Sequence, residues 1–298
     1  MFGEVWDIQT QEMLNLPVPE HEVKIVESHV TPTQAKYIDD LVDRATQIER
    51  GAVKPWEDNM LKIVSENKKL TLDMRILDQN IYDEFASTKI KRCIDNVFDI
   101  YTKTNEQKST QIIFLDQSVP LKYRNTISTN ADGTPNTFSA YDEIKRSLIE
   151  KGIPGDEIKF IHEAGDNNKE ALMKDMRLGK VRILLGSTTK AGTGLNIQDK
   201  AYAAHHLDLP WRPSDITQRN GRIIRQGNEN SKVYVFYYIE KGSMDSYLWQ
   251  TMENKQKFIG QLMAGKTDAR EMEDVSAVTF NPSLFKQVAE DNPQKAEF

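Results

Sequence analysis

Short apolar runs alternate with longer amphipathic segments in the second part of the chain. Five runs rich in Val, Ile, Leu and Ala cover residues 112–115, 158–161, 181–185, 201–207 and 233–239. Between them, the spacing of apolar residues predicts helices at 139–151, 167–178 and 213–226. Strands that alternate with helices are typical of a parallel sheet with helices on its faces, so we expect an α/β fold.

The first 107 residues have a different pattern, which is mostly helical. An amphipathic segment covers residues 33–50, and a second helical stretch at 82–102 carries an apolar face. Another long helical pattern follows at 243–263, and the tail beyond it is polar. We therefore predict three parts, namely a helical connector at 1–107, an α/β domain at 108–242, and a carboxyl-terminal helix and tail at 243–298.

Composition mainly excludes possibilities. Hydrophobic residues make up 38% of the 298 positions, which is enough for a core. The single cysteine, Cys93, allows no internal disulfide and no Cys-rich zinc site. With no membrane-length apolar run and no signal-peptide pattern after Met1, we expect a cytoplasmic protein without a membrane partner. The net charge of −6 means that nucleic acid would have to bind at a local basic patch.

The strongest candidate for chemistry is the sequence QRNGRIIRQG at residues 218–227. Gln218, Arg222 and Arg225 are four and three residues apart, which would place them on one face of a helix. Two permanently charged guanidinium groups suit an anion with several oxygens, such as a triphosphate. A solvated basic helix is the ordinary explanation of such spacing. Here, however, the predicted helix has an apolar side and follows a strand, so we expect the arginines near that strand's carboxyl end, where α/β proteins bind ligands.

A second candidate is the loop LGSTTKAGTGLN at residues 185–196, which follows a predicted strand. Gly192 and Gly194 would allow the main chain to approach a phosphate or a ribose closely. Thr188, Thr189 and Lys190 could hold a nucleic-acid backbone. A glycine pair alone is a weak signal, so this loop gains weight only from its neighbours.

Three blocks, at residues 112–116, 186–196 and 208–227, resemble motifs IV, V and VI of superfamily 2 helicases, with the Swi/Snf-type branch as the best match. Segments at 16–17, 58–61, 88–89 and 249–263 are similar to large phage and mobile-element helicases associated with DNA methyltransferases. The resemblance implies the carboxyl-terminal RecA-like lobe of a helicase. It also implies ATP with Mg²⁺ held mainly by an amino-terminal RecA-like lobe, and double-stranded DNA and a DNA methyltransferase as partners.

The resemblance also implies roles for individual residues. In the family, motif VI supplies arginine fingers to ATP bound by the other lobe, and this role falls on Arg222 and Arg225. Gln218 would help to couple the nucleotide to closure of the lobes. Motif V implies two further sets of contacts, with Thr188 and Lys190 on the nucleic-acid backbone and Gly192, Gly194 and Asn196 on the nucleotide.

Residues 260–267, GQLMAGKT, match the P-loop pattern letter for letter. A working P-loop follows a buried strand, whereas residues 249–259 predict a helix, so we interpret Gly265 as a helix stop. His205 and His206 are neighbours in a predicted strand and should point to opposite faces, which favours packing over metal binding. We find no acidic box for magnesium. Two alternatives to a helicase lobe stay open, namely a non-catalytic module that binds nucleic acid or protein, and a P-loop phosphotransferase that uses Lys266.

Overall fold

The computed structural model describes residues 17–81, 88–165, 168–191, 194–210 and 212–263. Its strands are β1 (Glu20–His29), β2 (Thr110–Phe114), β3 (Ile158–Phe160), β4 (Ile183–Gly186), β5 (Ala201–His206) and β6 (Lys232–Lys241). Its helices are α1 (Pro32–Glu49), α2 (Met60–Leu72), α3 (Thr88–Lys103), α4 (Ala140–Glu150), α5 (Lys169–Arg177), α6 (Thr188–Ala191), α7 (Pro213–Asn220) and α8 (Met244–Met263).

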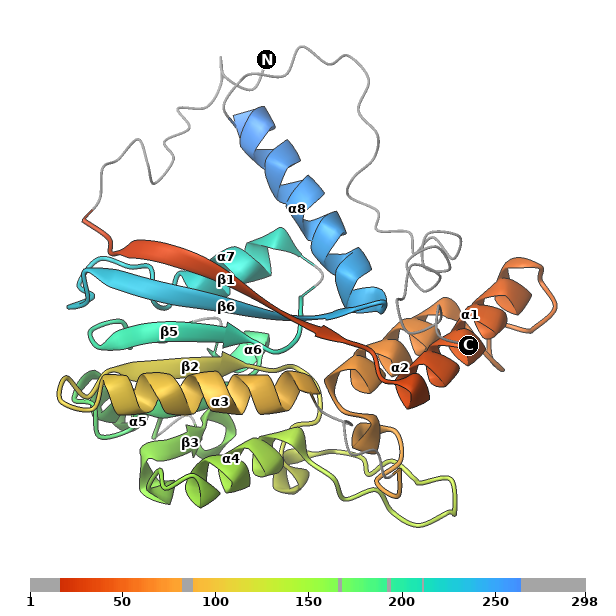
Figure 1. Cartoon of the computed structure of the whole chain (residues 1–298), viewed down its shortest axis with the longest axis horizontal. Coiled ribbons are helices and arrows are strands. Elements are labelled where there is room, and N and C mark those ends of the chain that lie inside the picture. The colour runs from red at the N-terminus through yellow and green to blue at the C-terminus, as the bar shows by residue number, and fades with distance from the viewer. Residues whose placement is uncertain (1–16, 82–87, 166–167, 192–193, 211, 264–298) are drawn as a thin grey trace.

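The six strands form one sheet in the order β1-β6-β5-β2-β4-β3, and every neighbouring pair is parallel. The predicted α/β fold is therefore confirmed, and the five predicted strands lie close to their expected positions. Because all strands run the same way, their carboxyl ends meet at a single edge. Helices α1 and α2 lie beyond that edge (Figure 1).

Strand β1 is the element that the sequence pattern did not predict. The described residues between 17 and 107 are mostly helical, as expected, but β1 pairs with β6 along all ten of its residues. Charged residues alternate along β1, and its apolar Val23 and Ile25 are about half exposed. An edge strand with one open side lacks the continuous apolar run of a buried strand, which explains why the pattern was missed.

Helices cover both faces of the sheet and create two apolar clusters. In β2, Ile112 belongs to one cluster and Ile113 to the other, because successive side chains point to opposite faces. Helices α3 and α4 pack on the face that carries Ile113. Helices α5, α7 and α8 pack on the opposite face. The central strands are buried on both sides, which accounts for the apolar runs in their sequences.

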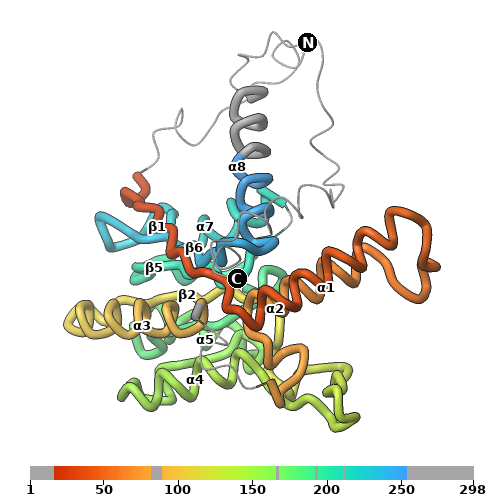
Figure 2. The backbone as a smooth tube through the Cα atoms, turned by 45° about the vertical axis from the view of Figure 1, so that its right-hand side comes forward, coloured from red at the N-terminus to blue at the C-terminus, as the bar shows by residue number. Residues whose placement is uncertain are grey.

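Helices α1 and α2 form a hairpin that projects from the body of the molecule (Figure 2). Thr31 caps α1 in a reciprocal capping box with Gln34. The Arg44 guanidinium holds the two helices together, because it lies 2.8 Å from the Asp58 carboxylate and 2.6 Å from that of Glu66. The hairpin therefore presents α2 to the carboxyl edge of the sheet in a fixed orientation. None of the helices in the described ranges has the length and apolarity needed to cross a membrane.

Candidate functional site

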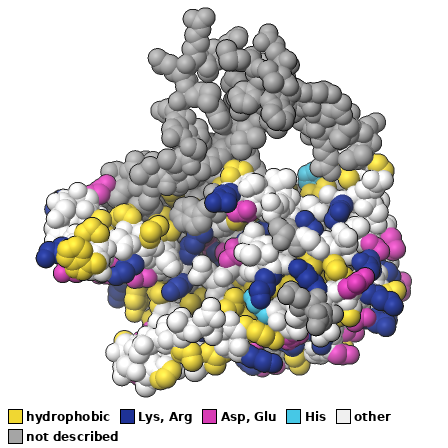
Figure 3. Space-filling model, turned by 180° about the vertical axis from the view of Figure 1, so that it is seen from behind, with side chains coloured by type: hydrophobic (Ala, Val, Ile, Leu, Met, Phe, Trp, Pro, Cys, Tyr) yellow, Lys and Arg dark blue, Asp and Glu magenta, His cyan; other side chains and the backbone are white. Residues whose placement is uncertain are grey.

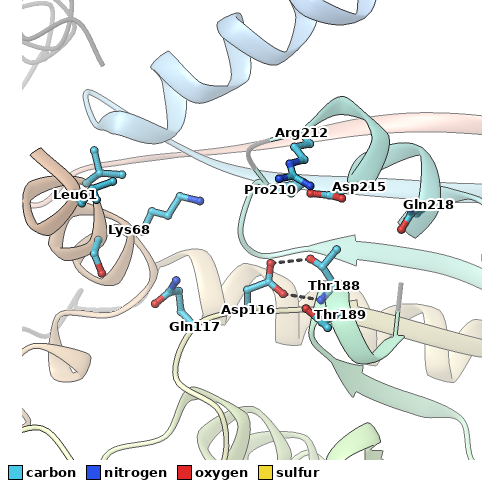
Figure 4. A pocket seen from close by; sticks show the side chains of 12 residues that line it. Leu61, Lys68, Asp116, Gln117, Thr188, Thr189, Pro210, Arg212, Asp215 and Gln218 are labelled. Carbon is cyan, nitrogen blue, oxygen red and sulfur yellow. Dashed lines mark hydrogen bonds between the residues drawn. The ribbon is translucent and has the colours of Figure 1, made fainter. Parts of the chain in front are cut away.

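A groove of about 670 Å³ lies between α2 and the carboxyl ends of the central strands (Figure 4). Three parts of the chain line it, since α2, the ends of β2 and β4, and the segment that enters α7 all contribute side chains. Those used below are Leu61, Lys68, Asp116, Thr188, Arg212 and Gln218. The groove thus includes Gln218 and Thr188 from the predicted site, and it adds a wall from the helical connector that the sequence did not suggest.

Thr188 is engaged on the inner side of the groove. Its hydroxyl donates to the Asp116 carboxylate at 2.6 Å and accepts from the guanidinium of Arg219, including an Nε contact of 3.0 Å. Its backbone N–H donates to the other oxygen of Asp116, also at 2.6 Å. Asp116 therefore caps the short helix α6 and fixes the loop that was predicted to contact nucleic acid. The predicted contact of Thr188 with a nucleic-acid backbone stays a prediction.

Arg219 is the residue that sequence reasoning missed. Its side chain is fully buried, and its guanidinium contacts the carboxylates of Asp116 at 2.8 Å and Asp208 at 3.1 Å. It also donates to the backbone oxygen of Asp208 at 2.8 Å and lies 3.4 Å from His206. A signal was present in the sequence, because position 219 falls on the apolar face of the helix that carries Ile216. A charged residue at such a position needs buried partners.

Burial changes the ionisation of the groups around this arginine. Burial raises the pKa of the Asp208 carboxyl, and the nearby charge of Asp116 raises it further, while Arg219 and Lys68 act in the opposite direction. Burial lowers the pKa of Lys68, whose ammonium donates to the Leu209 carbonyl at 3.0 Å. The cluster therefore contains two acidic and two basic side chains whose charges largely compensate one another.

Arg222 and Arg225 lie in a turn rather than on a helix, so the expectation that they share a helical face with Gln218 is wrong. Helix α7 ends at Asn220, whose side chain bonds to His206 and Tyr237 of the sheet. These tertiary bonds, together with the following glycine, end the helix earlier than its apolar pattern predicts. Gln218 alone of the three lines the groove.

The two arginines are instead held beside the loop before β5. Arg222 donates to the Leu195 carbonyl at 2.8 Å, and Arg225 donates to the side-chain oxygen of Asn196 at 2.9 Å. The pKa of Arg222 is lowered by its partial burial and by the neighbouring charge of Arg225. Within the described ranges, no carboxylate forms an ion pair with either guanidinium. Arg222 and Arg225 therefore lie beside Asn196, while the roles predicted for the three residues stay predictions.

Parts of the chain are similar to known proteins. Residues 126–227 match the family described as the helicase conserved C-terminal domain. A stretch of 108 residues is 37% identical to Defense against restriction protein B of Escherichia phage P1. This stretch covers 36% of this chain and 5% of that protein. A stretch of 140 residues is 32% identical to the Xenopus laevis SWI/SNF-related matrix-associated actin-dependent regulator of chromatin subfamily A-like protein 1, covering 47% of this chain and 14% of that protein. Residues 126–227 are thus similar to a helicase C-terminal domain, and the relatives that match parts of the chain include SWI/SNF-related proteins.

Solved structures share the fold of this chain. The Sulfolobus solfataricus SWI2/SNF2 ATPase core in complex with dsDNA aligns with a TM-score of 0.57 at 18% identity, covering 94% of this chain and 52% of that chain. At this identity the likeness shows the fold alone. The chain spans only a small part of the two relatives named above, so the activities of those whole proteins are not assigned to it here.

The remaining predicted positions of the helicase lobe are distributed around the same loop. Lys190 is exposed in α6, and Gly194 is exposed and has a φ of +68°, a backbone conformation that favours glycine. Gly192 lies outside the described residues, so its predicted contact with a nucleotide stays a prediction. The same holds for the roles of Lys190 and Gly194.

Two features that invited other interpretations have structural explanations. His205 and His206 are both fully buried on opposite faces of the sheet, as expected, where His205 bonds to Tyr238 and Gln111. The P-loop match begins inside α8, so the element before it is a helix rather than a strand, while residues 264–267 lie outside the described residues. Among the described residues, no group of three or more His, Cys, Asp or Glu side chains could hold a metal ion.

Proposed function

We propose that this lobe is the carboxyl-terminal half of an ATP-dependent DNA translocase or helicase, and that Arg222 and Arg225 are its arginine fingers. In this proposal an amino-terminal RecA-like lobe, in the same chain or another, holds ATP and Mg²⁺. The lobe described here closes over that nucleotide, with Gln218 and the loop at Gly192, Gly194 and Asn196 near it. It is not an autonomous ATPase.

The observation that carries the proposal is the pairing of Arg222 and Arg225 in one turn without a carboxylate partner among the described residues. Two adjacent guanidinium groups repel each other, and a protein normally compensates such a pair with acidic side chains. Their contacts to the Leu195 and Gln218 carbonyls and to the Asn196 side chain are to neutral oxygens and leave most of the five N–H groups of each guanidinium available. Such a pair fits a polyanion supplied from outside the lobe.

The chemistry follows from where negative charge develops during phosphoryl transfer. ATP with Mg²⁺, when bound, would supply the phosphoryl group and a metal ion that offsets its negative charge. Arg222 and Arg225 place fixed positive charge opposite the oxygens that gain negative charge, so they stabilise the transition state more than the ground state. In this proposal the metal is held mainly by the other lobe, as the resemblance to superfamily 2 helicases implies.

Duplex DNA is the nucleic acid that we propose for the groove. The groove presents Lys68 and Arg212, with Lys190 exposed nearby in α6. Lysine and arginine side chains are interspersed with acidic ones on the face seen from behind (Figure 3), so a phosphate backbone would meet local basic groups rather than a broad positive surface. A solved structural neighbour bound to dsDNA supports this choice. A DNA methyltransferase is proposed as a partner from the resemblance to phage helicases.

The test uses Arg222→Ala in the full protein that joins this lobe to its ATP-binding lobe. We expect the DNA-stimulated rate of ATP hydrolysis to fall by about 10³-fold or more, because one arginine finger contributes about 10³ to 10⁵ in rate. The control is Arg146→Ala, which removes an equally charged but exposed side chain from α4. The isolated lobe should show no ATP turnover.

The same measurement separates the alternative of a non-catalytic binding module. If Arg222→Ala leaves ATP hydrolysis intact and instead weakens binding of a duplex oligonucleotide, the arginines serve binding and the proposed catalytic role is wrong. A clear ATPase rate from the pure isolated lobe would also contradict the proposal.

A further inference from the structure

Arg219 occupies a position between the groove and the turn that carries the arginine fingers. Its partners Asp116, Thr188 and Asp208 follow β2, β4 and β5, which are three neighbouring strands of the sheet. One guanidinium therefore joins the carboxyl ends of three strands. On the groove side, Asp116 and Thr188 line the surface that Figure 4 shows, and dashed lines mark their two mutual hydrogen bonds.

The acidic partners of Arg219 hold the backbone of the groove as well as its side chains. The Asp208 carboxylate accepts from the backbone N–H groups of Asp116 and Gln117, so it fixes the chain just after β2. Asp116 in turn accepts from the backbone N–H of Thr188. A movement of either groove segment would therefore change the lengths of the bonds to the Arg219 guanidinium.

The backbone of Arg219 is hydrogen-bonded to the turn that carries Arg222. Its carbonyl accepts from the backbone N–H of Arg222 at 3.1 Å, in the turn that ends α7. The guanidinium also lies over the Phe114 ring, with 5.2 Å between the guanidinium carbon and the ring centroid, so the side chain is held at one end by the sheet while its backbone is bonded to the turn. Dense packing transmits a displacement instead of absorbing it.

We propose that Arg219 is a positioning residue that couples occupancy of the groove to the placement of Arg222. The inference rests on the proposed function. When a nucleic-acid backbone engages the segments at Gln117 and Thr188, the Asp116–Arg219–Asp208 cluster shifts with them and moves the turn at Arg222 toward its working position. The fork of the guanidinium has five N–H donors and contacts Thr188, both carboxylates and the Asp208 carbonyl, whereas the three donors of an ammonium cannot reproduce all of these contacts.

The experiment measures ATP hydrolysis with and without duplex DNA in the full protein, for Arg219→Lys and for Arg182→Lys. Arg182 is the matched control, because it is also buried and bonded but lies before β4, at the amino end of the strands, where its partners include the carbonyls of Ser109 and Tyr101. We expect Arg219→Lys to lower the ratio of stimulated to unstimulated rate about tenfold, within the range of measured coupling between sites. The DNA concentration for half-maximal stimulation should stay within about threefold of the wild-type value, and Arg182→Lys should leave the ratio unchanged.

A merely structural role would give a different result. Loss of folded protein lowers both rates in the same proportion, so an unchanged ratio in Arg219→Lys overturns the inference. If that variant does not fold, Asp116→Asn, at a partly exposed position, replaces it with the same expected fall in the ratio. Failure of the proposed function is recognised separately, since Arg222→Ala would then retain its ATPase rate.

Discussion

Two buried histidines, His205 and His206, make the stability of the folded chain depend on pH. Burial lowers the pKa of His205 to about 3, and that of His206 is lowered for the same reason and by the charge of Arg219. Both are neutral in the folded protein near neutral pH. An unfolded histidine has a pKa of about 6.5, so between about pH 6.5 and 3 the unfolded chain binds more protons than the folded one. The stability that depends on neutral histidine is therefore lost as the pH falls through this window.

We predict that His205→Gln makes the lobe less sensitive to acid. Between about pH 6 and 4, the free energy of unfolding should change with pH less steeply than in the wild type, by up to about 1.4 kcal/mol per pH unit. Urea titrations at several pH values measure this slope. His29→Gln, at an exposed position of β1, is the control and should keep the wild-type slope. Parallel slopes in all three proteins would contradict the prediction.

For single residues, the sequence pointed to the arginine pair but did not predict its position in the structure. The spacing of Arg222 and Arg225 identified the pair, yet the helix that was to present them ends at Asn220. Arg219 was missed because a buried arginine is recognised by its partners Asp116 and Asp208, which are about 100 and 11 residues away in sequence. Contacts over such separations leave no periodic pattern.

At the scale of elements, the ends of helices α1, α4 and α5 were predicted well, and a glycine with a positive φ follows each of them within two residues. Gly179 has a φ of +68° and follows α5, in agreement with the expected helix stop. It is also tightly enclosed, because a Cβ atom at this position would lie 2.6 Å from the Lys108 carbonyl oxygen. The helix therefore ends where both the backbone conformation and the available space require glycine.

We predict that Gly179→Ala lowers the free energy of unfolding more than Gly51→Ala does. Gly51 has nearly the same φ, +67°, but its Cβ would meet nothing within 4 Å. The cost at Gly51 should be about 1 kcal/mol, from the backbone conformation alone. At Gly179 the contact with Lys108 should add about 1–3 kcal/mol. Chemical denaturation of both variants tests this, and equal losses would show that the backbone at Lys108 moves away freely.

At the scale of the whole molecule, a buried ion pair joins two helices whose paired residues are 156 positions apart in the sequence. The ammonium of Lys89, near the start of α3, contacts the carboxylate of Asp245, near the start of α8, and both are almost completely buried. Asp245 also accepts from the Thr71 hydroxyl at the end of α2. Three separate helices therefore depend on one carboxylate.

We predict that Lys89→Met lowers the free energy of unfolding by about 3–5 kcal/mol, because it leaves the Asp245 carboxylate buried without its cation. Thermal and urea unfolding measure the loss. Lys91→Met changes an exposed lysine two residues away and should cost less than about 0.5 kcal/mol. A loss of similar size in the two variants would mean that water replaces the ammonium of Lys89.

The fold class was predictable because buried parallel strands have continuous apolar runs, and five of the six strands described here follow that rule. The groove was not predictable, since its wall at Lys68 comes from a helix far from the motifs in sequence. Its acidic and basic groups compensate one another locally, so a net charge of −6 carried no information about it.

The pairing of β1 with β6 also has a consequence for how the lobe is made. Glu20, the first residue of β1, pairs with Lys232, so a ribosome must add 212 residues after Glu20 before its partner residue in β6 exists. At about 5–20 residues per second, β1 waits for roughly 10–40 s during synthesis. Throughout that time its backbone amides and its apolar Val23 and Ile25 are available to other nascent chains. Assembly of the sheet in the cell is therefore completed at the edge that emerged first.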